Sequence, residues 1–290
     1  MGGGVRKILN FSELKKYYFI YPSITEQTKI VSLLNKKCSE IDALTADIQT
    51  QIETLEEYKK SVITEAVTKG LDPNVEMKDS GVEWIGKISK TFKVSRIKFC
   101  YKVILGKMIN STQYPEENMS NYLCAANIKW GGVDTSIHKK MYISEKEKLN
   151  ILLNKGDILI MEGGNAGTAC IYNNEFYPCY IQNSVHRCFG INGFINNYLY
   201  YWMFVVFHSD YINLICNKAT IRHYTKEKVD NTPIVVPSSL SEQKKITDYL
   251  DQKCSEIDQT ISEKQQQLET LAEYKKSLIY EYVTGKKEVA

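Results

Sequence analysis

A stretch of 43 residues occurs twice in this chain of 290 residues, once near each end. Residues 26–68 align without a gap onto residues 242–284, and about 25 of the 43 positions are identical, including the blocks KCSEID and EYKKS. The two copies lie too far apart in the sequence for a solenoid, in which repeats follow one another directly. The repeat therefore predicts two matching helical arms that flank one globular domain.

Each copy of the repeat has the signals that begin an α-helix. Ser23 stands three residues before Glu26, and Ser239 stands three residues before Glu242. A serine followed at this spacing by a glutamate can form a capping box. We therefore predict that both helices begin at these serines.

Apolar residues recur along both copies at the spacing of a coiled-coil seam. The predicted seam of the first copy contains Ile41, Leu44, Ile48, Leu55, Tyr58 and Val62, and that of the second contains Ile257, Lys264, Leu271 and Leu278. A long polar helix cannot bury such a stripe alone, so each helix needs a partner. Because the first arm enters the domain and the second leaves it, we predict an antiparallel coiled coil within one chain. A second copy of the chain is the alternative source of the partner helix.

Composition is typical of a soluble protein, with 43% hydrophobic and 24% charged residues. The N-terminus lacks an apolar segment typical of a secretion signal, and the most apolar stretch, residues 198–207, is too short to span a bilayer. The cysteines form no C-x-x-C pair. We therefore expect reduced thiols, a cytoplasmic location and no membrane association.

Charge is distributed unevenly along the chain. Residues 85–237 carry 18 Lys and Arg against 11 Asp and Glu, a balance of +7, whereas the rest carries 19 against 23, a balance of −4. A basic middle between mildly acidic arms favours a polyanion partner for the middle and protein partners for the arms.

The middle of the chain predicts a mixed domain, so the fold class is α+β. The expected elements are a strand at 158–161, a glycine-rich loop at 163–167, a hairpin of 168–172 with 175–180, a strand at 182–187 and an apolar helix within 194–217. Trp84 has apolar neighbours on both sides and is predicted to be a packing anchor.

Sequence motifs of several enzyme classes are absent. The chain contains no Pro-Pro, which the Asn/Asp-Pro-Pro-aromatic motif of adenine methyltransferases requires, and no G-x-x-x-x-G-K-[ST] phosphate loop. The four histidines show no spacing typical of a metal site or a catalytic triad. We predict no catalytic residue, no metal site and no cofactor.

Five short segments occur in a characteristic order. They are PSITEQ (22–27), DSGVEWIG (79–86), KGDIL (155–159), ATIRH (219–223) and PSSLSEQ (237–243). Together they resemble the specificity subunit of type I restriction-modification enzymes over nearly the whole chain. The resemblance implies a target recognition domain that binds double-stranded DNA, and two helices that form an antiparallel spacer and dock methyltransferase subunits. A restriction (nuclease) subunit is a further candidate partner.

The resemblance also implies domain boundaries. These are a remnant tail of a first recognition domain (1–22), the first long helix (23–70), a connector (71–84), the target recognition domain (85–237), the second long helix (238–285) and a C-terminal tail (286–290). A full specificity subunit has two recognition domains, so the chain resembles a truncated or half-size form. We expect a homodimer that recognises an interrupted palindrome, since the aromatic segment 17–21 needs a partner. The alternative is an interaction protein that binds methyltransferase subunits and modulates or blocks the parent complex.

Candidate DNA contacts lie in polar loops and strand ends of the recognition domain. They are Lys129, Trp130, Asn165, Gln182, Asn183, Arg187, Arg222, His223 and Lys226. Arginine and the amides suit guanine and adenine edges, and lysine mostly holds phosphates. For each of them, ordinary surface polarity is the alternative interpretation. We predict that replacing Arg187 or Arg222 by alanine weakens DNA binding.

Overall fold

The computed structural model describes residues 11–18, 20–109, 114–216 and 223–289. Its α-helices are α1 (Phe11–Leu14), α2 (Ile24–Lys69), α3 (Ile97–Cys100), α4 (Glu145–Ile151), α5 (Asn196–His208), α6 (Tyr211–Ile215), α7 (Lys226–Asn231) and α8 (Leu240–Val283). The chain divides into two compact units. The first unit contains the residues up to 56 together with those from 257 onward, and the second contains residues 57–256. The predicted mixed fold with two long helices is confirmed.

Among the residues that the structure describes, the strands are short and form five small sheets. They are β1 (Met77–Asp79), β2 (Lys87–Ser89), β3 (Lys93–Arg96), β4 (Tyr101–Leu105), β5 (Met119–Leu123), β6 (Ile128–Lys129), β7 (Gly132–Val133), β8 (Lys139–Tyr142), β9 (Ile158–Met161), β10 (Ala169–Ile171), β11 (Cys179–Ile181), β12 (Val185–Gly190) and β13 (Pro233–Val236). The largest sheet has the order β10-β9-β12-β4 and is antiparallel throughout. A second sheet has the order β11-β5-β8.

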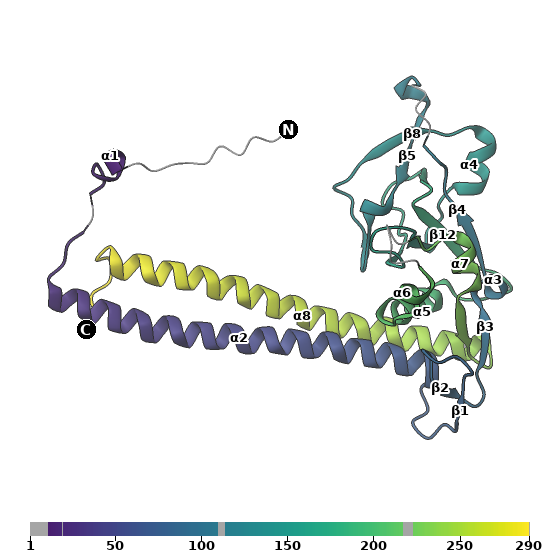
Figure 1. Ribbon diagram of the computed structural model, residues 1–290, viewed down its shortest axis with the longest axis horizontal. Coiled ribbons are helices and arrows are strands. Elements are labelled where there is room, and N and C mark those ends of the chain that lie inside the picture. The colour runs from purple at the N-terminus through teal and green to yellow at the C-terminus, as the bar shows by residue number, and fades with distance from the viewer. Residues whose placement is uncertain (1–10, 19, 110–113, 217–222, 290) are drawn as a thin grey trace. The chain divides into compact units, whose positions relative to one another are not determined.

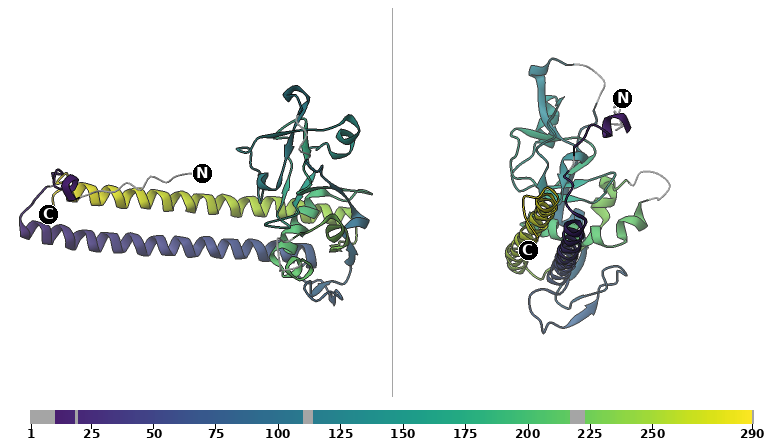
Figure 2. Two further views of the ribbon diagram at one scale, coloured as in Figure 1. Left: turned by 45° about the horizontal axis from the view of Figure 1, so that its top comes forward. Right: turned by 90° about the vertical axis from the view of Figure 1, so that its left-hand side faces the viewer.

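Helices α2 and α8 lie side by side within each unit and run in opposite directions (Figures 1 and 2). In the first unit, Lys275 donates to Asp42 and Lys264 donates to Gln51. The residue number rises along one helix as it falls along the other, which is the pattern of an antiparallel pair. The apolar stripe of each helix is thereby covered by the other helix.

The seam of α2 differs in one respect from the predicted seam. Ile41 and Ile48 are buried as expected, but Ile52 is buried with them, while Leu44 and Tyr58 are each 47% exposed. The predicted seam positions of Leu44 and Tyr58 are therefore wrong. On a helix, the residues three and four positions after a seam residue lie on opposite sides of the apolar stripe. Helix α8 covers the side that contains Ile52, four residues after Ile48, and leaves exposed the side that contains Leu44, three residues after Ile41.

One bond of each predicted capping box forms, but at both helices the glutamate carboxylate accepts from a donor other than the backbone N–H of the capping serine. Glu26 donates its backbone N–H to Ser23 Oγ at 3.3 Å, and Glu242 donates to Ser239 Oγ at 3.1 Å. The Glu242 carboxylate, however, accepts from the backbone N–H of Ser238 at 3.2 Å rather than from Ser239. Side-chain oxygens therefore satisfy N–H groups at the starts of both helices.

Strand β9 lies between the two apolar cores of the second unit. Ile158 and Ile160 belong to one core, and Leu159 and Met161 belong to the other. Successive side chains of a strand point to opposite faces, so a strand covered on both sides is apolar at every position. The first core also contains Ile63 of α2, so the end of this helix is part of the globular domain.

Three expectations for the domain need correction. The hairpin of 168–172 with 175–180 is wrong, because β10 pairs with β9, and β11 pairs in parallel with β5. The strand expected from Gln182 begins only at Val185, whose N–H closes a turn onto the Gln182 carbonyl at 2.9 Å. The apolar helix breaks at Ser209 into α5 and α6.

Trp84 is a packing residue, as predicted. Its ring stacks on Tyr211 at a centroid distance of 5.0 Å and lies 5.8 Å from Trp202 of α5. These contacts attach the connector after α2 to the globular domain. In the part of the chain that the structure describes, no helix combines the length and the apolar character needed to cross a membrane.

The burial of Ile52 predicts the effect of two alanine substitutions in the first unit. Ile52→Ala should lower the free energy of unfolding by about 2–4 kcal/mol, because it opens a cavity in the seam. Leu44→Ala should change it by less than about 0.5 kcal/mol, because Leu44 is exposed. Urea unfolding followed by circular dichroism measures both. Equal losses of unfolding free energy in the two variants would show that Leu44 belongs to the seam, as predicted from sequence.

Candidate nucleic-acid interface

Three polar segments of the second unit meet at Glu162. Its backbone N–H donates to the Ser184 carbonyl at 2.9 Å, and its carbonyl accepts from the Tyr224 N–H at 2.7 Å. Gly163 and His223 form a further β-bridge. These bonds bring together the loop at 162–168, the turn at 182–184 and the segment at 223–226. The glycine-rich loop lies between β9 and β10, where it was expected.

The amide side chains on these segments have defined orientations. Gln182 Nε2 donates to Asn183 Oδ1 at 2.7 Å, and Ser184 Oγ donates to Gln182 Oε1 at 2.5 Å. Asn165 is exposed, and its carbonyl accepts from Thr168 Oγ1 at 2.8 Å, which closes the loop. Hydrogen bonds thus orient the side chains of Gln182, Asn183 and Ser184 before any ligand arrives, whereas the bond at Asn165 holds the backbone of the loop.

The Glu162 carboxylate lies between two imidazoles. His186 Nε2 is 3.8 Å from one carboxylate oxygen, and His223 Nδ1 is 3.7 Å from the other. His186 is fully buried, and its Nε2 must carry a proton because it lies 2.9 Å from the Tyr224 carbonyl, which can only accept. Burial lowers the pKa of His186 and favours the neutral ring.

Arg187 does not reach this surface. It is buried, its Nε donates to Asp157 Oδ2 at 2.6 Å, and its guanidinium lies 4.8 Å from the centre of the Phe189 ring. A buried, paired guanidinium does not have the geometry that a direct base contact requires. This position indicates that Arg187 stabilises the sheet beneath the candidate interface.

Trp130 is also placed for packing rather than for stacking on a base. Its ring makes edge contacts with Phe204 and Phe207 of α5, each at a centroid distance of 5.3 Å. Its indole nitrogen is buried and has no acceptor among the described residues. The neighbouring Lys129 is exposed at the end of β6.

The remaining predicted contacts differ in their surroundings. His223 is exposed, and Lys226 is partly exposed and forms an ion pair with Asp230. Arg222 lies outside the described residues. The structure therefore brings Asn165, Gln182, Asn183, His223 and Lys226 onto the three segments that meet at Glu162, while Lys129 lies on a separate strand.

Sequence reasoning missed Lys107, which fixes the turn at 182–184. Its N–H donates to the Ile181 carbonyl at 2.9 Å, and its carbonyl accepts from Asn183 at 3.0 Å. A Cβ on the preceding Gly106 would lie 2.3 Å from the Gln182 carbonyl oxygen, so this close approach requires glycine. A glycine at the end of the apolar stretch 101–105 was the signal available in the sequence.

Lys107 also forms an ion pair with the helix that covers this region. Its Nζ lies 2.6 Å from Glu147 Oε1, and Ser144 caps α4 by accepting the N–H of Glu147. The hydrogen bond from Lys107, followed by those from Ser144, lowers the pKa of Glu147 to about 2. The described residues include no group of three or more His, Cys, Asp or Glu side chains arranged to hold a metal ion.

The family of the chain follows from its sequence. The family model for the type I restriction modification DNA specificity domain matches residues 89–270, which is more than half of the chain. The chain therefore belongs to this family. It is also 24% identical over 278 residues to a putative type I restriction enzyme MjaX specificity subunit of Methanocaldococcus jannaschii, and the match covers 96% of this chain and 61% of that relative.

Two solved structures have a similar fold. One is a chain from a study of complex assembly and conformational transition of the type I R-M system, with a TM-score of 0.69, 15% identity, and coverage of 92% of this chain and 61% of the other. The second is the HsdS subunit from Thermoanaerobacter tengcongensis, with a TM-score of 0.56, 15% identity, and coverage of 99% and 65%. The chain thus spans less than two thirds of the length of these relatives.

The buried ion pair predicts what Arg187→Ala does. The substitution leaves Asp157 buried and unpaired, so it should lower the free energy of unfolding by about 3–5 kcal/mol. Thermal unfolding of the free protein measures this loss without DNA. If the variant kept its stability but failed to bind DNA, Arg187 would be a DNA contact, as predicted from sequence.

The Lys107–Glu147 pair predicts an acid-dependent contribution to stability. The pKa of Glu147 in the folded protein is about 2, below the ordinary value of about 4.3. The ion pair therefore stabilises the fold fully above about pH 4.3, and this contribution is lost as the pH falls toward 2. Glu147→Gln should reduce stability at pH 7 by no more than about 1 kcal/mol, since the carboxylate is 40% exposed. Wild type and variant should converge near pH 2. A constant difference across this range in urea unfolding would contradict the assignment.

Proposed function

We propose that the chain is the DNA-recognition component of a type I restriction-modification system. In this proposal the globular domain binds double-stranded DNA, the two long helices bind methyltransferase subunits, and the chain itself is not a catalyst. The observation that carries the proposal is the meeting of three polar segments at Glu162, on a domain with a charge balance of +7, in a chain of the specificity family. A restriction subunit is a further proposed partner.

The polar residues of these segments that are at least partly exposed, together with Lys129 on β6, are the proposed DNA contacts. The amides of Asn165, Gln182 and Asn183 suit adenine edges, and Lys129 and Lys226 suit phosphates. His223 belongs to the same proposed surface, and Arg222 stays a DNA contact predicted from sequence. Arg187 and Trp130 are proposed to support it from beneath, because both are held in packing contacts.

Exposed apolar residues of the first unit support a bipartite DNA site. Ile63 and Val67 are 1% and 0% exposed where the globular domain covers them, whereas their counterparts in the repeat, Ile279 and Val283, are 39% and 54% exposed. The residue types are identical, so the difference reflects what covers them. We propose that a second copy of the chain covers this end, which gives a homodimer with two recognition domains and an interrupted palindrome as its target.

The aromatic segment before α2 supports the same proposal. Tyr17, Tyr18, Ile20 and Tyr21 are all exposed. The corresponding segment before α8 is β13, which pairs with β3 and buries Ile234. An exposed aromatic segment of this kind is a candidate for pairing with another chain.

The alternative proposal is an interaction protein that binds methyltransferase subunits and blocks or modulates a parent complex. The observation that favours it is the burial of Arg187 together with the partial burial of Trp130, because it reduces the number of side chains available to contact bases. The proposed DNA face retains several exposed polar side chains, so DNA recognition remains the better-supported function.

The test of the proposed function is to co-express the chain with a cognate type I methyltransferase subunit in a methylation-free host. Mapping N6-methyladenine across the genome should yield an interrupted palindrome. An asymmetric bipartite site would contradict the homodimer and indicate a different partner chain. Assembly without methylation would support the blocking protein instead.

The phosphate contacts predict a change in salt dependence. Lys129→Ala and Lys226→Ala should each weaken binding of the assembled complex to its target and reduce the magnitude of the slope of log K against log salt by about 0.9. Lys90→Ala is the matched control, because Lys90 also forms an ion pair, with Glu76, but lies outside the three segments that meet at Glu162. Fluorescence anisotropy between 50 and 200 mM salt would measure the slopes. Unchanged slopes in both test variants would place the DNA elsewhere.

A further inference from the structure

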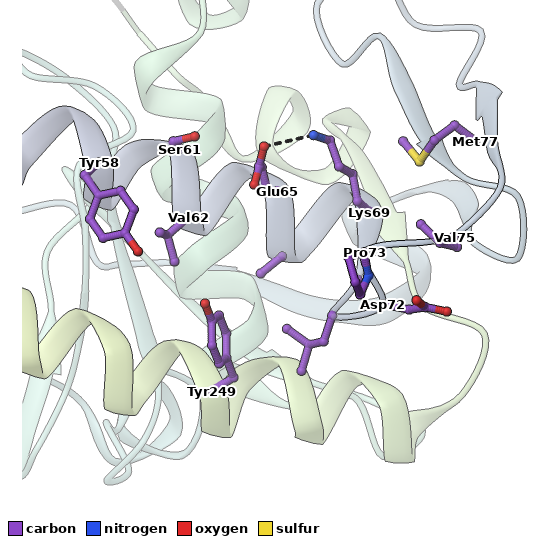
Figure 3. A pocket seen from close by; sticks show the side chains of 13 residues that line it. Tyr58, Ser61, Val62, Glu65, Lys69, Asp72, Pro73, Val75, Met77 and Tyr249 are labelled. Carbon is purple, nitrogen blue, oxygen red and sulfur yellow. Dashed lines mark hydrogen bonds and ion pairs between the residues drawn. The ribbon is translucent and has the colours of Figure 1, made fainter.

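The Glu162 carboxylate retains most of its capacity to accept hydrogen bonds. Its contacts among the described residues are nitrogens of His186 and His223, at 3.8 and 3.7 Å, and both distances exceed the length of a hydrogen bond. By contrast, Glu65 Oε1 lies 2.9 Å from Lys69 Nζ in the pocket shown in Figure 3. An ionised carboxylate can accept about four hydrogen bonds, so Glu162 has acceptor sites left for a ligand.

The buried neighbour of Glu162 does not fill these sites. His186 is fully buried, and its Nε2 proton is directed at the Tyr224 carbonyl, 2.9 Å away. Burial lowers the pKa of His186, so the ring is neutral and forms no ion pair with the carboxylate. Stabilisation of the fold by an ion pair therefore does not explain an acid at position 162.

The other side of the carboxylate is open. The side chain of Glu162 is 19% exposed, and that of His223 is 59% exposed. Gly163 and Gly164 come next in the chain and have no side chains. Among the described residues, nothing except the chain neighbours of Gly164 lies within 4 Å of the position that a Cβ would take there. Glycine at such a place lets a ligand approach closely, so a base edge can reach the carboxylate beside the loop.

The backbone holds Glu162 and His223 next to each other. Gly163 and His223 form a β-bridge, and the His223 carbonyl accepts from Lys228 Nζ at 2.8 Å. The backbone of Glu162 is bonded on both sides, as described above. The two side chains therefore present an acceptor and a donor as one unit.

A carboxylate is unfavourable on a surface that binds DNA, because it repels phosphates. Residues 85–237 have a charge balance of +7, and Glu162 is an acid at the point where the proposed DNA contacts meet. The groups on DNA from which a carboxylate can accept are the base amines. In the major groove these are cytosine N4 and adenine N6. The position of Glu162 thus favours contact with a base amine.

The neighbouring imidazole favours a C·G base pair. His223 Nδ1, when it carries the proton, is a donor 3.7 Å from the acceptor Glu162 Oε1. In a C·G pair, cytosine N4 and guanine O6 are hydrogen-bonded to each other, so an amine and a carbonyl lie about 2.9 Å apart at the groove edge. An A·T pair has the same two groups, but its adenine N7 acceptor lies beside the amine and would repel the carboxylate. Cytosine has only a C–H group at that place.

We propose that Glu162 and His223 together read one C·G base pair in the major groove, where the Glu162 carboxylate accepts from cytosine N4 and the His223 imidazole donates to guanine O6. The inference rests on the proposed function, which supplies the DNA. It makes Glu162 a specificity-determining residue, and the base pair occurs once in each half-site of the target.

The test uses the chain assembled with a cognate type I methyltransferase subunit, on the target found by mapping N6-methyladenine. Replacing the C·G pair should weaken wild-type binding about 10-fold or more in fluorescence anisotropy, as expected for the loss of a paired base contact. N4-methylcytosine at this position should weaken it similarly, because the methyl group takes the place of the carboxylate while pairing with guanine is retained. In Glu162→Ala both effects should disappear, and preferences at the other positions should remain. In His223→Ala the preference for C·G should fall at the same position.

Glu145→Ala is the matched control, because Glu145 is an exposed acid of α4 that forms an ion pair with Lys148. Thermal unfolding of each free variant reports whether it is folded, and the N4-methylcytosine measurement on wild type needs no variant. The inference would be wrong, and the proposed function would stand, if wild type tolerated N4-methylcytosine at every cytosine of the target. The same conclusion would follow if Glu162→Ala weakened binding equally to all sequences. No methylated target in wild type would overturn the proposed function, and the inference with it.

Discussion

The mutual burial of the apolar stripes of α2 and α8 is the contact on which the rest of the structure depends. Each helix is mostly polar, and the seam at Ile41, Ile48 and Ile52 is covered only because α8 runs antiparallel beside it. The same pairing places the block EYKKS of one helix beside the block KCSEID of the other. One constraint thus explains the stability of both long helices.

The features that sequence predicted well are those set by local rules. The repeat, the caps at Ser23 and Ser239 and the buried positions of Ile41 and Ile48 depend on residues within one or two helical turns, so their spacing is visible in the sequence. The side of the stripe that is buried was not visible in this way. It depends on where α8 lies, and the sequence of α2 does not contain that information.

The features that sequence missed depend on contacts between distant residues. The guanidinium of Arg187 has the chemistry of a base contact, but Asp157, thirty residues earlier, pairs with it inside the domain. Strand β11 follows a turn that suggests a hairpin, yet its partner is β5, nearly sixty residues earlier. Lys107 orders the turn at 182–184 through bonds across a similar separation. The candidate DNA surface could therefore be predicted as a set of segments, but not residue by residue.

The most direct test of this account is hydrogen exchange of the first unit after one buried residue of α8 is made polar. Leu278→Asp places a carboxylate in the seam, so if the helices stabilise each other, amides at 34–45 of α2 should exchange about tenfold faster or more. Gln265→Asp, on the exposed side of α8, should leave them unchanged. Continued protection of residues 34–45 in Leu278→Asp would show that α2 does not depend on α8, and would contradict the account.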